Sequence, residues 1–267
     1  MKKRKTVGLA LGSGGFRGFA HIGVIRSLEK HGIPIDYLSG ASIGAWVAAS
    51  YAIFKDSKKI ETDLTDKTRE NWPILLDFSL KSGFINGQKF FKFLETSLNH
   101  YNFSKTLIPL KIVASDLLTG NAYIFDKGDI AKAVRASTSI PLIFKPIKYK
   151  NKLLVDGGIC NPVPCDLVKD MGADVIIGVN LYSRKEFFGG ELSIANIALR
   201  TMRIFLGNTA EESMKLSDVM ININVSKYSK TSSLSKYFTK EIAEEIIKIG
   251  ERETDKKIPM IKKMLGI

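Results

Sequence analysis

Segments typical of strands alternate with helical patterns at the start of this chain. They predict strands at residues 6–11 and 35–38 and helices at 19–31 and 45–54. A glycine loop at 12–18 and a glycine turn at 40–44 join each strand to the helix that follows it. In the first helix Ile22, Ile25 and Leu28 recur at helical spacing, and Gly32 and Pro34 end it. Strands alternating with helices build a parallel sheet covered by helices. The sequence therefore predicts an α/β fold with three layers, α/β/α, and a mainly parallel central sheet.

Later segments extend this pattern. Further strands are predicted at 111–115, 122–125, 152–155 and 174–179, and further helices at 129–137 and 166–171. With 267 residues, 45% of them hydrophobic, the chain has enough material for one domain over residues 1–267. Within it we expect a motif-bearing part at about 7–180, a helical, lid-like region at about 56–108 and a C-terminal helical region at about 184–267.

Charge and hydropathy favour a cytoplasmic protein. No apolar run approaches the roughly 20 residues that a membrane-spanning helix needs. The apolar stretch at 7–11, behind a basic start, is too short for a secretory signal and runs into a glycine loop. A net charge of +13 predicts either a solvated basic surface or peripheral contact with an anionic inner membrane surface. No nucleic-acid-reading motif is present, so we expect no nucleic acid partner.

The chemistry begins with a G-x-S-x-G motif formed by Gly40, Ser42 and Gly44, between a predicted strand and a predicted helix. A serine on such a sharp turn has its hydroxyl pushed into a cleft, and the glycines avoid collisions with neighbouring backbone. The positive end of the following helix also points at the serine. The motif alone is weak evidence, but its strand–turn–helix context predicts that Ser42 is a nucleophile.

The first glycine loop, residues 12–18, can supply backbone N–H groups to an oxyanion. Because the loops after neighbouring parallel strands gather at the carboxyl edge, we expect it to face Ser42. The competing interpretation is a dinucleotide fingerprint with Gly12, Gly14 and a ribose-binding Asp36. That fingerprint fails at its third small residue, where Arg17 stands, and it leaves the serine unused.

A serine nucleophile needs a base, and the three histidines are poorly placed for that role. In a Ser-Asp-His hydrolase the histidine comes last, yet none follows Asp156. His21 and His31 lie on the first predicted helix, His31 as a helix-end residue, and His100 could act only if its irregular region folded over the serine. A histidine triad is therefore not expected.

Asp156 remains as the candidate base. It stands at a predicted strand end, where Gly157 and Gly158 free the backbone to bring it close to the serine. A carboxylate with an ordinary pKa of about 3.9 is a poor base in water. A short hydrogen bond in a partly desolvated cleft would make it serviceable. Cys160 and Cys165 form neither a disulfide framework nor a zinc site and are expected to be packing residues.

Taken in order, these three glycine motifs resemble the patatin-like phospholipase family, in particular its small bacterial members. The resemblance covers about residues 7–179 and includes A-S-x-x-I-P at 136–141 and A-x-D at 114–116. One departure is Ser13, where many members have glycine, and backbone donors survive that change. The resemblance implies a patatin-like fold and hydrolysis of fatty-acyl esters of phospholipids or simpler lipids, with neither metal nor cofactor.

The resemblance also assigns roles to residues. It implies a Ser-Asp dyad in which Ser42 is the nucleophile and Asp156 the proton acceptor, with an acyl-Ser42 intermediate released by water. An oxyanion hole would come from the backbone of Gly14 and Gly15, with Arg17 nearby. The supporting glycines of the motifs are Gly12, Gly18, Gly40, Gly44, Gly157 and Gly158. Asp116 is expected to be structural. The non-enzymatic alternative is a catalytically silent membrane-associated or regulatory binding protein.

The segment at residues 72–94 is rich in aromatic side chains, Trp72, Phe78, Phe84 and Phe90 among them. It has two interpretations. The segment could line an acyl channel or cover the cleft as a lid that touches lipid, or its aromatic side chains could belong to the core.

Overall fold

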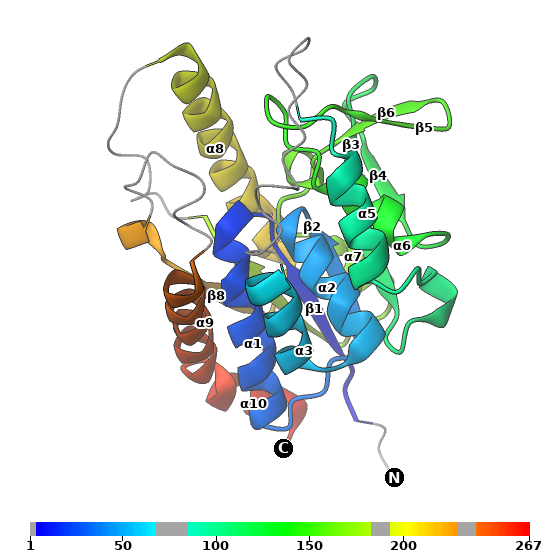
Figure 1. The fold of residues 1–267 in the computed structure, drawn as a ribbon. Coiled ribbons are helices and arrows are strands. Elements are labelled where there is room, and N and C mark those ends of the chain that lie inside the picture. The colour runs from blue at the N-terminus through cyan, green and yellow to red at the C-terminus, as the bar shows by residue number, and fades with distance from the viewer. Residues whose placement is uncertain (1–3, 68–84, 183–192, 229–238) are drawn as a thin grey trace.

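The computed structural model describes residues 4–67, 85–182, 193–228 and 239–267. Among these, eight strands form one mixed sheet with helices on both faces, in the order β5-β6-β3-β2-β1-β7-β8, with β4 paired to β3 (Figure 1). The strands are β1 Val7–Leu11, β2 Tyr37–Ala41, β3 Leu110–Asp116, β4 Ala122–Phe125, β5 Ile147–Tyr149, β6 Lys152–Val155, β7 Val175–Asn180 and β8 Val219–Asn222. The predicted three-layer α/β fold is confirmed.

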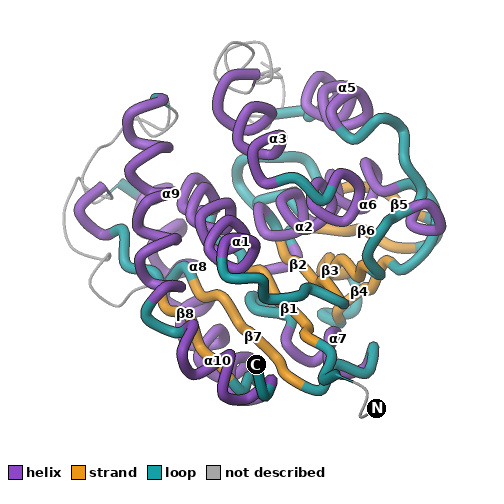
Figure 2. Tube along the Cα trace, turned by 90° about the horizontal axis from the view of Figure 1, so that it is seen from below, coloured by secondary structure: helices purple, strands orange, loops and turns teal. Residues whose placement is uncertain are grey.

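The helices connect these strands and extend beyond them. They are α1 Phe19–Lys30, α2 Ile43–Phe54, α3 Ser57–Thr62, α5 Gln88–Ser97, α6 Ile130–Ser137, α7 Cys165–Asp170, α8 Ile194–Ser213, α9 Lys240–Asp255 and α10 Ile258–Leu265. Figure 2 shows α1 and α2 on one side of the strands and α7 on the other. Within the described ranges, no helix is both long and apolar enough to cross a lipid bilayer.

Five neighbouring strands, β3, β2, β1, β7 and β8, run parallel, whereas β4, β5 and β6 are added by antiparallel pairing. The last residue of β1, Leu11, is in register with Gly40 of β2 and Val179 of β7. The loops that leave these strands therefore start side by side at the carboxyl edge of the sheet. This register brings the two glycine loops together.

The two faces of β1 carry two separate cores. Leu9 and Leu11 belong to the larger core under α1 and α2, and both are fully buried. Ala10 points the other way, into a smaller core with Val168 of α7 and Ile176 of β7. Because both faces are covered, β1 is apolar at every position, as expected for a buried parallel strand.

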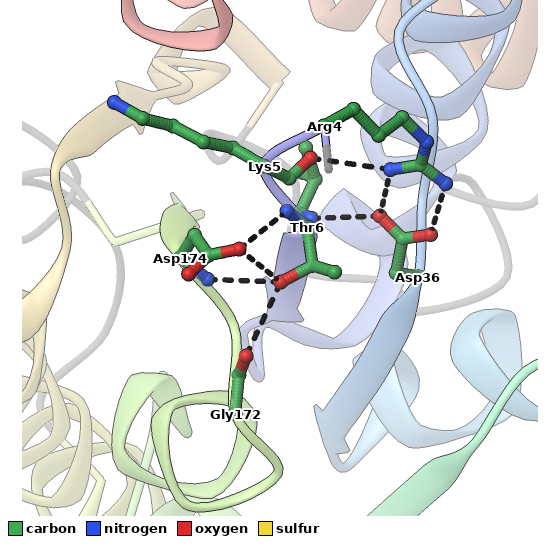
Figure 3. Close-up of polar contacts among 7 residues, drawn as sticks. Arg4, Lys5, Thr6, Asp36, Gly172 and Asp174 are labelled. Carbon is green, nitrogen blue, oxygen red and sulfur yellow. Dashed lines mark hydrogen bonds and ion pairs between the residues drawn. The ribbon is translucent and has the colours of Figure 1, made fainter. Parts of the chain in front are cut away.

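The amino edge of the sheet is held by polar contacts (Figure 3). Arg4 forms a two-pronged ion pair with Asp36, with N–O distances of 2.7 and 2.5 Å, and the Asp36 carboxylate also accepts from the N–H of Val7 at 2.8 Å. The backbone N–H of Thr6 donates to Asp174 at 2.8 Å. Asp36 thus lies at the edge opposite the glycine loops, which removes the acid that a dinucleotide site would require.

Two features of the structure differ from the sequence prediction. The C-terminal region at 184–267, predicted to be helical, also contains β8, and β5 was not predicted at all. β8 has only four residues, of which Val219 and Ile221 face inward, and β7 is its one partner among the described strands. A strand of three or four residues is too short to show a clear alternating pattern, so neither β5 nor β8 carries a periodic signal.

The lid-like region at 56–108 is described only in part. It contains α3, a π-helical turn at 63–67 and α5. In α5, Phe90 is buried and its ring meets that of Trp46 edge-on, with centroids 5.6 Å apart, so this aromatic belongs to the core. Trp72, Phe78 and Phe84 lie outside the described residues.

Candidate active site

Ser42 occupies the sharp turn between β2 and α2. Its φ of 55° lies in the left-handed region, which a residue with a side chain rarely adopts. The turn is held by a hydrogen bond from the backbone N–H of Ser42 to the hydroxyl of Ser137, at 2.8 Å. The carbonyl of Ser42 accepts from the N–H of Ala45 at 2.9 Å and so begins the helix. The backbone therefore fixes where the serine side chain points.

The glycines around Ser42 are required by close contact between the two loops. A Cβ placed on Gly44 would lie 2.1 Å from the carbonyl oxygen of Leu11, and one on Gly40 would lie 2.5 Å from the Cα of Ala45. Neither approach is tolerable for a side chain. The start of α2 therefore rests directly on the end of β1, which sets the first glycine loop beside Ser42.

Asp156 follows β6 and caps a short 3-10 turn, Gly157–Ile159. The hydroxyl of Ser42 donates to Asp156 Oδ2 at 2.5 Å, and the backbone N–H of Gly158 donates to Asp156 Oδ1 at 2.8 Å. The Asp156 carbonyl accepts from the hydroxyl of Ser115 at 2.8 Å. The carboxylate is thus fixed at both oxygens, with one of them facing Ser42.

The environment of Asp156 makes it a better base than an ordinary aspartate. Only 6% of the residue is exposed. Burial raises the pKa of Asp156 to about 6, against the hydrogen bonds from Ser42 and Gly158, which lower it. A carboxyl group with a pKa somewhat below the working pH is largely ionised, and its carboxylate binds a proton more strongly than an ordinary aspartate does. Burial depends on the whole fold, so the motif alone did not predict this shift.

The loop at residues 12–18 offers donors close to this pair. Among the described residues, the backbone N–H groups of Gly14 and Gly15 have no hydrogen-bond acceptor. Gly15 has a φ of 60° and open space where a Cβ would stand. Arg17 is buried, and its Nη1 donates to the Gly14 carbonyl at 3.0 Å. Because a trans peptide holds C=O and N–H in opposite directions, this contact fixes the direction of the Gly15 N–H.

Neither His21 nor His31 is hydrogen-bonded to the Ser42–Asp156 pair. His21 is fully buried and donates from Nε2 to the Gly12 carbonyl at 2.7 Å, and burial lowers its pKa to about 4. It therefore stays neutral and braces the first glycine loop, a role that its place in the sequence did not reveal. His31 stands at the end of α1, where its Nδ1 contacts the Ser27 carbonyl at 2.9 Å.

A second contact missed by sequence analysis joins the first glycine loop to the segment that follows β7. The hydroxyl groups of Ser13 and Tyr182 are hydrogen-bonded at 2.9 Å. Ser13 Oγ lies only 2.5 Å from where a Cβ of Gly158 would stand, so the serine fills the space beside the turn that holds Asp156. Burial raises the pKa of Tyr182, which keeps its hydroxyl protonated. The unusual serine of the loop is thus packed against the site.

Asp116 and the cysteines lie in structural positions. Asp116 forms an ion pair with Lys152 at 2.9 Å and accepts from Thr119 at 3.0 Å. The hydrogen bond from Lys152 lowers the pKa of Asp116. Cys165 is buried in the smaller core, and burial raises its pKa to about 12. Cys160 donates to the Gly120 carbonyl at 3.3 Å.

The family model of the patatin-like phospholipases matches residues 9–169, which contain both glycine loops, Ser42 and Asp156. The chain belongs to the patatin-like phospholipase family. Its three motifs, far apart in the sequence, converge at the carboxyl edge of the sheet of this patatin-like fold.

Similar proteins include much longer ones. An uncharacterised NTE family protein of Mycobacterium tuberculosis is 36% identical over 178 residues, covering 66% of this chain and 49% of the relative. A lysophospholipase of Candida albicans is 30% identical over 187 residues, covering 67% of this chain and 13% of the relative. The chain thus spans about half the length of the first relative and about an eighth of the length of the second. The crystal structure of VipD from Legionella pneumophila, 16% identical, has the same fold, with a TM-score of 0.62 over 96% of this chain and 67% of that chain.

Proposed function

We propose that this patatin-like protein is a serine acyl hydrolase that cleaves fatty-acyl esters of lipids with a Ser42–Asp156 dyad. The observation that carries the proposal is the 2.5 Å hydrogen bond from Ser42 Oγ to a buried carboxylate whose pKa is raised to about 6. The names of relatives, a lysophospholipase of Candida albicans and neuropathy target esterase sws of Drosophila melanogaster, support a lipid ester as the substrate class. Such a lipid would be the main partner, and the charge of +13 favours contact with an anionic membrane surface.

The proposed reaction has two halves. Ser42 Oγ attacks the ester carbonyl while Asp156 Oδ2 takes its proton, and the oxyanion receives hydrogen bonds from the N–H groups of Gly14 and Gly15. The proton then passes to the leaving alkoxide, which leaves an acyl ester on Ser42. In the second half, water gives its proton to Asp156 and attacks the acyl ester, and the fatty acid departs as Ser42 recovers its proton.

Labelling with a fluorophosphonate tests the nucleophile. We expect the wild type to be labelled covalently and Ser42→Ala to lose the label together with at least about 10⁴-fold of its turnover of p-nitrophenyl butyrate. Asp156→Asn should retain the fold and lose about a thousandfold, because a positioned base contributes about 10²–10⁴. The matched control is Ser50→Ala. Ser50 is as buried as Ser42 and lies on α2, the helix that follows Ser42.

The outcomes separate hydrolysis from a silent binding role. If Ser50→Ala labels like the wild type and Ser42→Ala does not, the nucleophile is assigned. If the folded wild type neither labels nor hydrolyses the ester, or Ser42→Ala keeps full activity, the hydrolase proposal is wrong and a regulatory binding protein becomes the leading interpretation.

A further inference from the structure

Helix α8 stands clear of the body of the protein, where Figure 1 shows it rising past the carboxyl edge of the sheet. From Ile194 to Thr209 none of its described side chains is buried. Ala210 is the first buried residue of the helix, and it packs in the smaller core with Met214. The helix is therefore anchored at its C-terminal end, and most of its length is open to solvent.

The exposed length of α8 is apolar over much of its surface, with Ile194, Ile197 and Ile204 exposed on it, and one apolar face lines a groove. Ala198, Met202, Phe205 and Leu206 follow the spacing of one helical stripe, and Phe205 is 67% exposed. By the same helical spacing, Arg200 and Arg203 project from the opposite face. An exposed apolar stripe that none of the described residues covers is typical of a place where another apolar group binds.

This stripe forms one wall of a groove, and Ile159, three residues after Asp156, also lines it. The groove has a volume of about 540 Å³ and is lined by Ile159 and by α8 residues between Ala198 and Thr209. No charged side chain is among the described residues that line it. Ile159 is the last residue of the 3-10 turn that Asp156 caps, and the N–H of Gly158 in that turn holds Asp156 Oδ1. The groove and the carboxylate therefore share one short turn.

The dimensions of the groove suit an extended hydrocarbon chain. Ala198 and Thr209 are eleven residues apart, so the lining runs for about 16 Å along the helix axis. That length and the volume fall within the range of small-molecule sites, and the scarcity of polar groups leaves nothing to orient a polar ligand. Two threonines, Thr201 and Thr209, line the groove, and the Thr209 hydroxyl already donates to the Phe205 carbonyl within the helix.

We propose that this α8 groove, formed by Ile159 and the apolar face of α8, binds the acyl chain of the ester that Ser42 attacks. The proposal rests on the hydrolase function proposed above and deepens it, because it makes long-chain esters the preferred substrates. An acyl chain is favoured over a protein segment as the occupant because the groove is apolar along its length and adjoins the turn that fixes the dyad.

Replacing Phe205 tests the groove. Phe205→Ser should lower the ratio of kcat/KM for p-nitrophenyl laurate to that for p-nitrophenyl butyrate about tenfold. That is the smallest effect expected when an apolar site loses contact with a single methylene of its substrate. The matched control is Ile204→Ser. Ile204 is the neighbouring residue, 46% exposed, but it does not line the groove. This control should leave the ratio unchanged.

A binding measurement separates the groove from catalysis. Titration of the Ser42→Ala protein with cis-parinaric acid, a fluorescent long-chain fatty acid, should give a Kd that Phe205→Ser raises about tenfold and Ile204→Ser does not. If the wild type hydrolyses no ester but this difference holds, the hydrolase function fails and the groove stands. If Phe205→Ser changes neither the ratio nor the Kd, the proposal is overturned. Loss of binding to anionic vesicles alone, with ratio and Kd unchanged, would overturn it in favour of a membrane-docking face.

Discussion

The two edges of the sheet use aspartate in opposite ways. At the amino edge Asp36 is paired with Arg4, and that hydrogen bond holds the pKa of Asp36 below its usual value. At the carboxyl edge Asp156 is buried, its described hydrogen-bond donors, Ser42 and Gly158, are neutral, and its pKa is raised to about 6. Folding therefore favours the charged form of one carboxylate and disfavours that of the other.

This difference separates stabilisation from reactivity. A group whose charged form is favoured by folding adds stability at neutral pH, and a group whose charged form is disfavoured subtracts it. In the proposed mechanism, the same raised pKa favours transfer of the Ser42 proton to Asp156. The left-handed backbone of Ser42 adds strain at the same edge, whereas Arg4, Thr6 and Asp174 add hydrogen bonds at the other.

The largest expected effect is on stability, where Asp156→Asn and Asp36→Asn should move in opposite directions. Near pH 7.5, Asp156→Asn should raise the free energy of unfolding by about 3 kcal/mol, because it removes a carboxyl group whose pKa folding raises from about 3.9 to about 6. Asp36→Asn should lower it by about 1 kcal/mol, a small loss because Arg4 is 56% exposed. Urea denaturation followed by circular dichroism measures both.

The pH dependence distinguishes these effects from simple repacking. Because folding raises the pKa of Asp156, the free energy of unfolding of the wild type should fall as pH rises from about 4 to 6. The stability advantage of Asp156→Asn should therefore disappear near pH 4. The contribution of Asp36 is present above its unfolded pKa of about 3.9 and is lost as pH falls through its lower folded pKa. Equal shifts of the same sign in both variants would show that the two carboxylates are not opposed.

A second, smaller effect is the pH profile of esterase activity. If Asp156 accepts the proton from Ser42, kcat/KM for p-nitrophenyl butyrate should fall about tenfold between pH 7 and pH 5, because the base is protonated below about pH 6. Circular dichroism at each pH would show that the protein stays folded. A profile that stays flat down to pH 4.5 would mean that another group is the base, or that burial does not raise the pKa of Asp156.

Local patterns in the sequence predicted most strands and helices up to residue 180 to within two residues, but they did not predict the short strands β5 and β8. The strand–turn–helix around Ser42 was predictable because glycine spacing and helical periodicity lie within a few neighbouring residues. Strand β2 was predicted at 35–38 but is Tyr37–Ala41, because its boundaries depend on pairing with β1 and β3. The short strand β8 depends wholly on a partner that is distant in the sequence.

The candidate site divides in the same way. The motifs indicated Ser42, Asp156 and the glycine loop, since each requires particular residues at fixed spacing. The contacts of His21 with Gly12 and of Tyr182 with Ser13 join segments with no shared motif, so only the folded chain shows them. Burial, and with it the pKa of Asp156, is likewise a property of the whole structure.

The smallest expected effect concerns the hydrogen bond between Tyr182 and Ser13, which adjoins the turn that holds Asp156. Tyr182→Phe removes this 2.9 Å contact and leaves the Ser13 hydroxyl without its partner. Since a net hydrogen bond contributes about 0.5–1.5 kcal/mol, we expect kcat for p-nitrophenyl butyrate to fall about threefold to tenfold with little change in KM.

Combining the two substitutions decides whether Tyr182 acts through Ser13. Ser13→Gly restores the glycine that many family members have and removes the other hydroxyl of the pair. If the two side chains position the loop through one hydrogen bond, adding Tyr182→Phe to Ser13→Gly should cause no further loss of kcat. Strictly multiplicative losses would instead mean that Tyr182 supports the fold independently of the loop. A Tyr182→Phe enzyme with unchanged kcat would show that the carboxyl edge needs only its backbone contacts to hold the dyad.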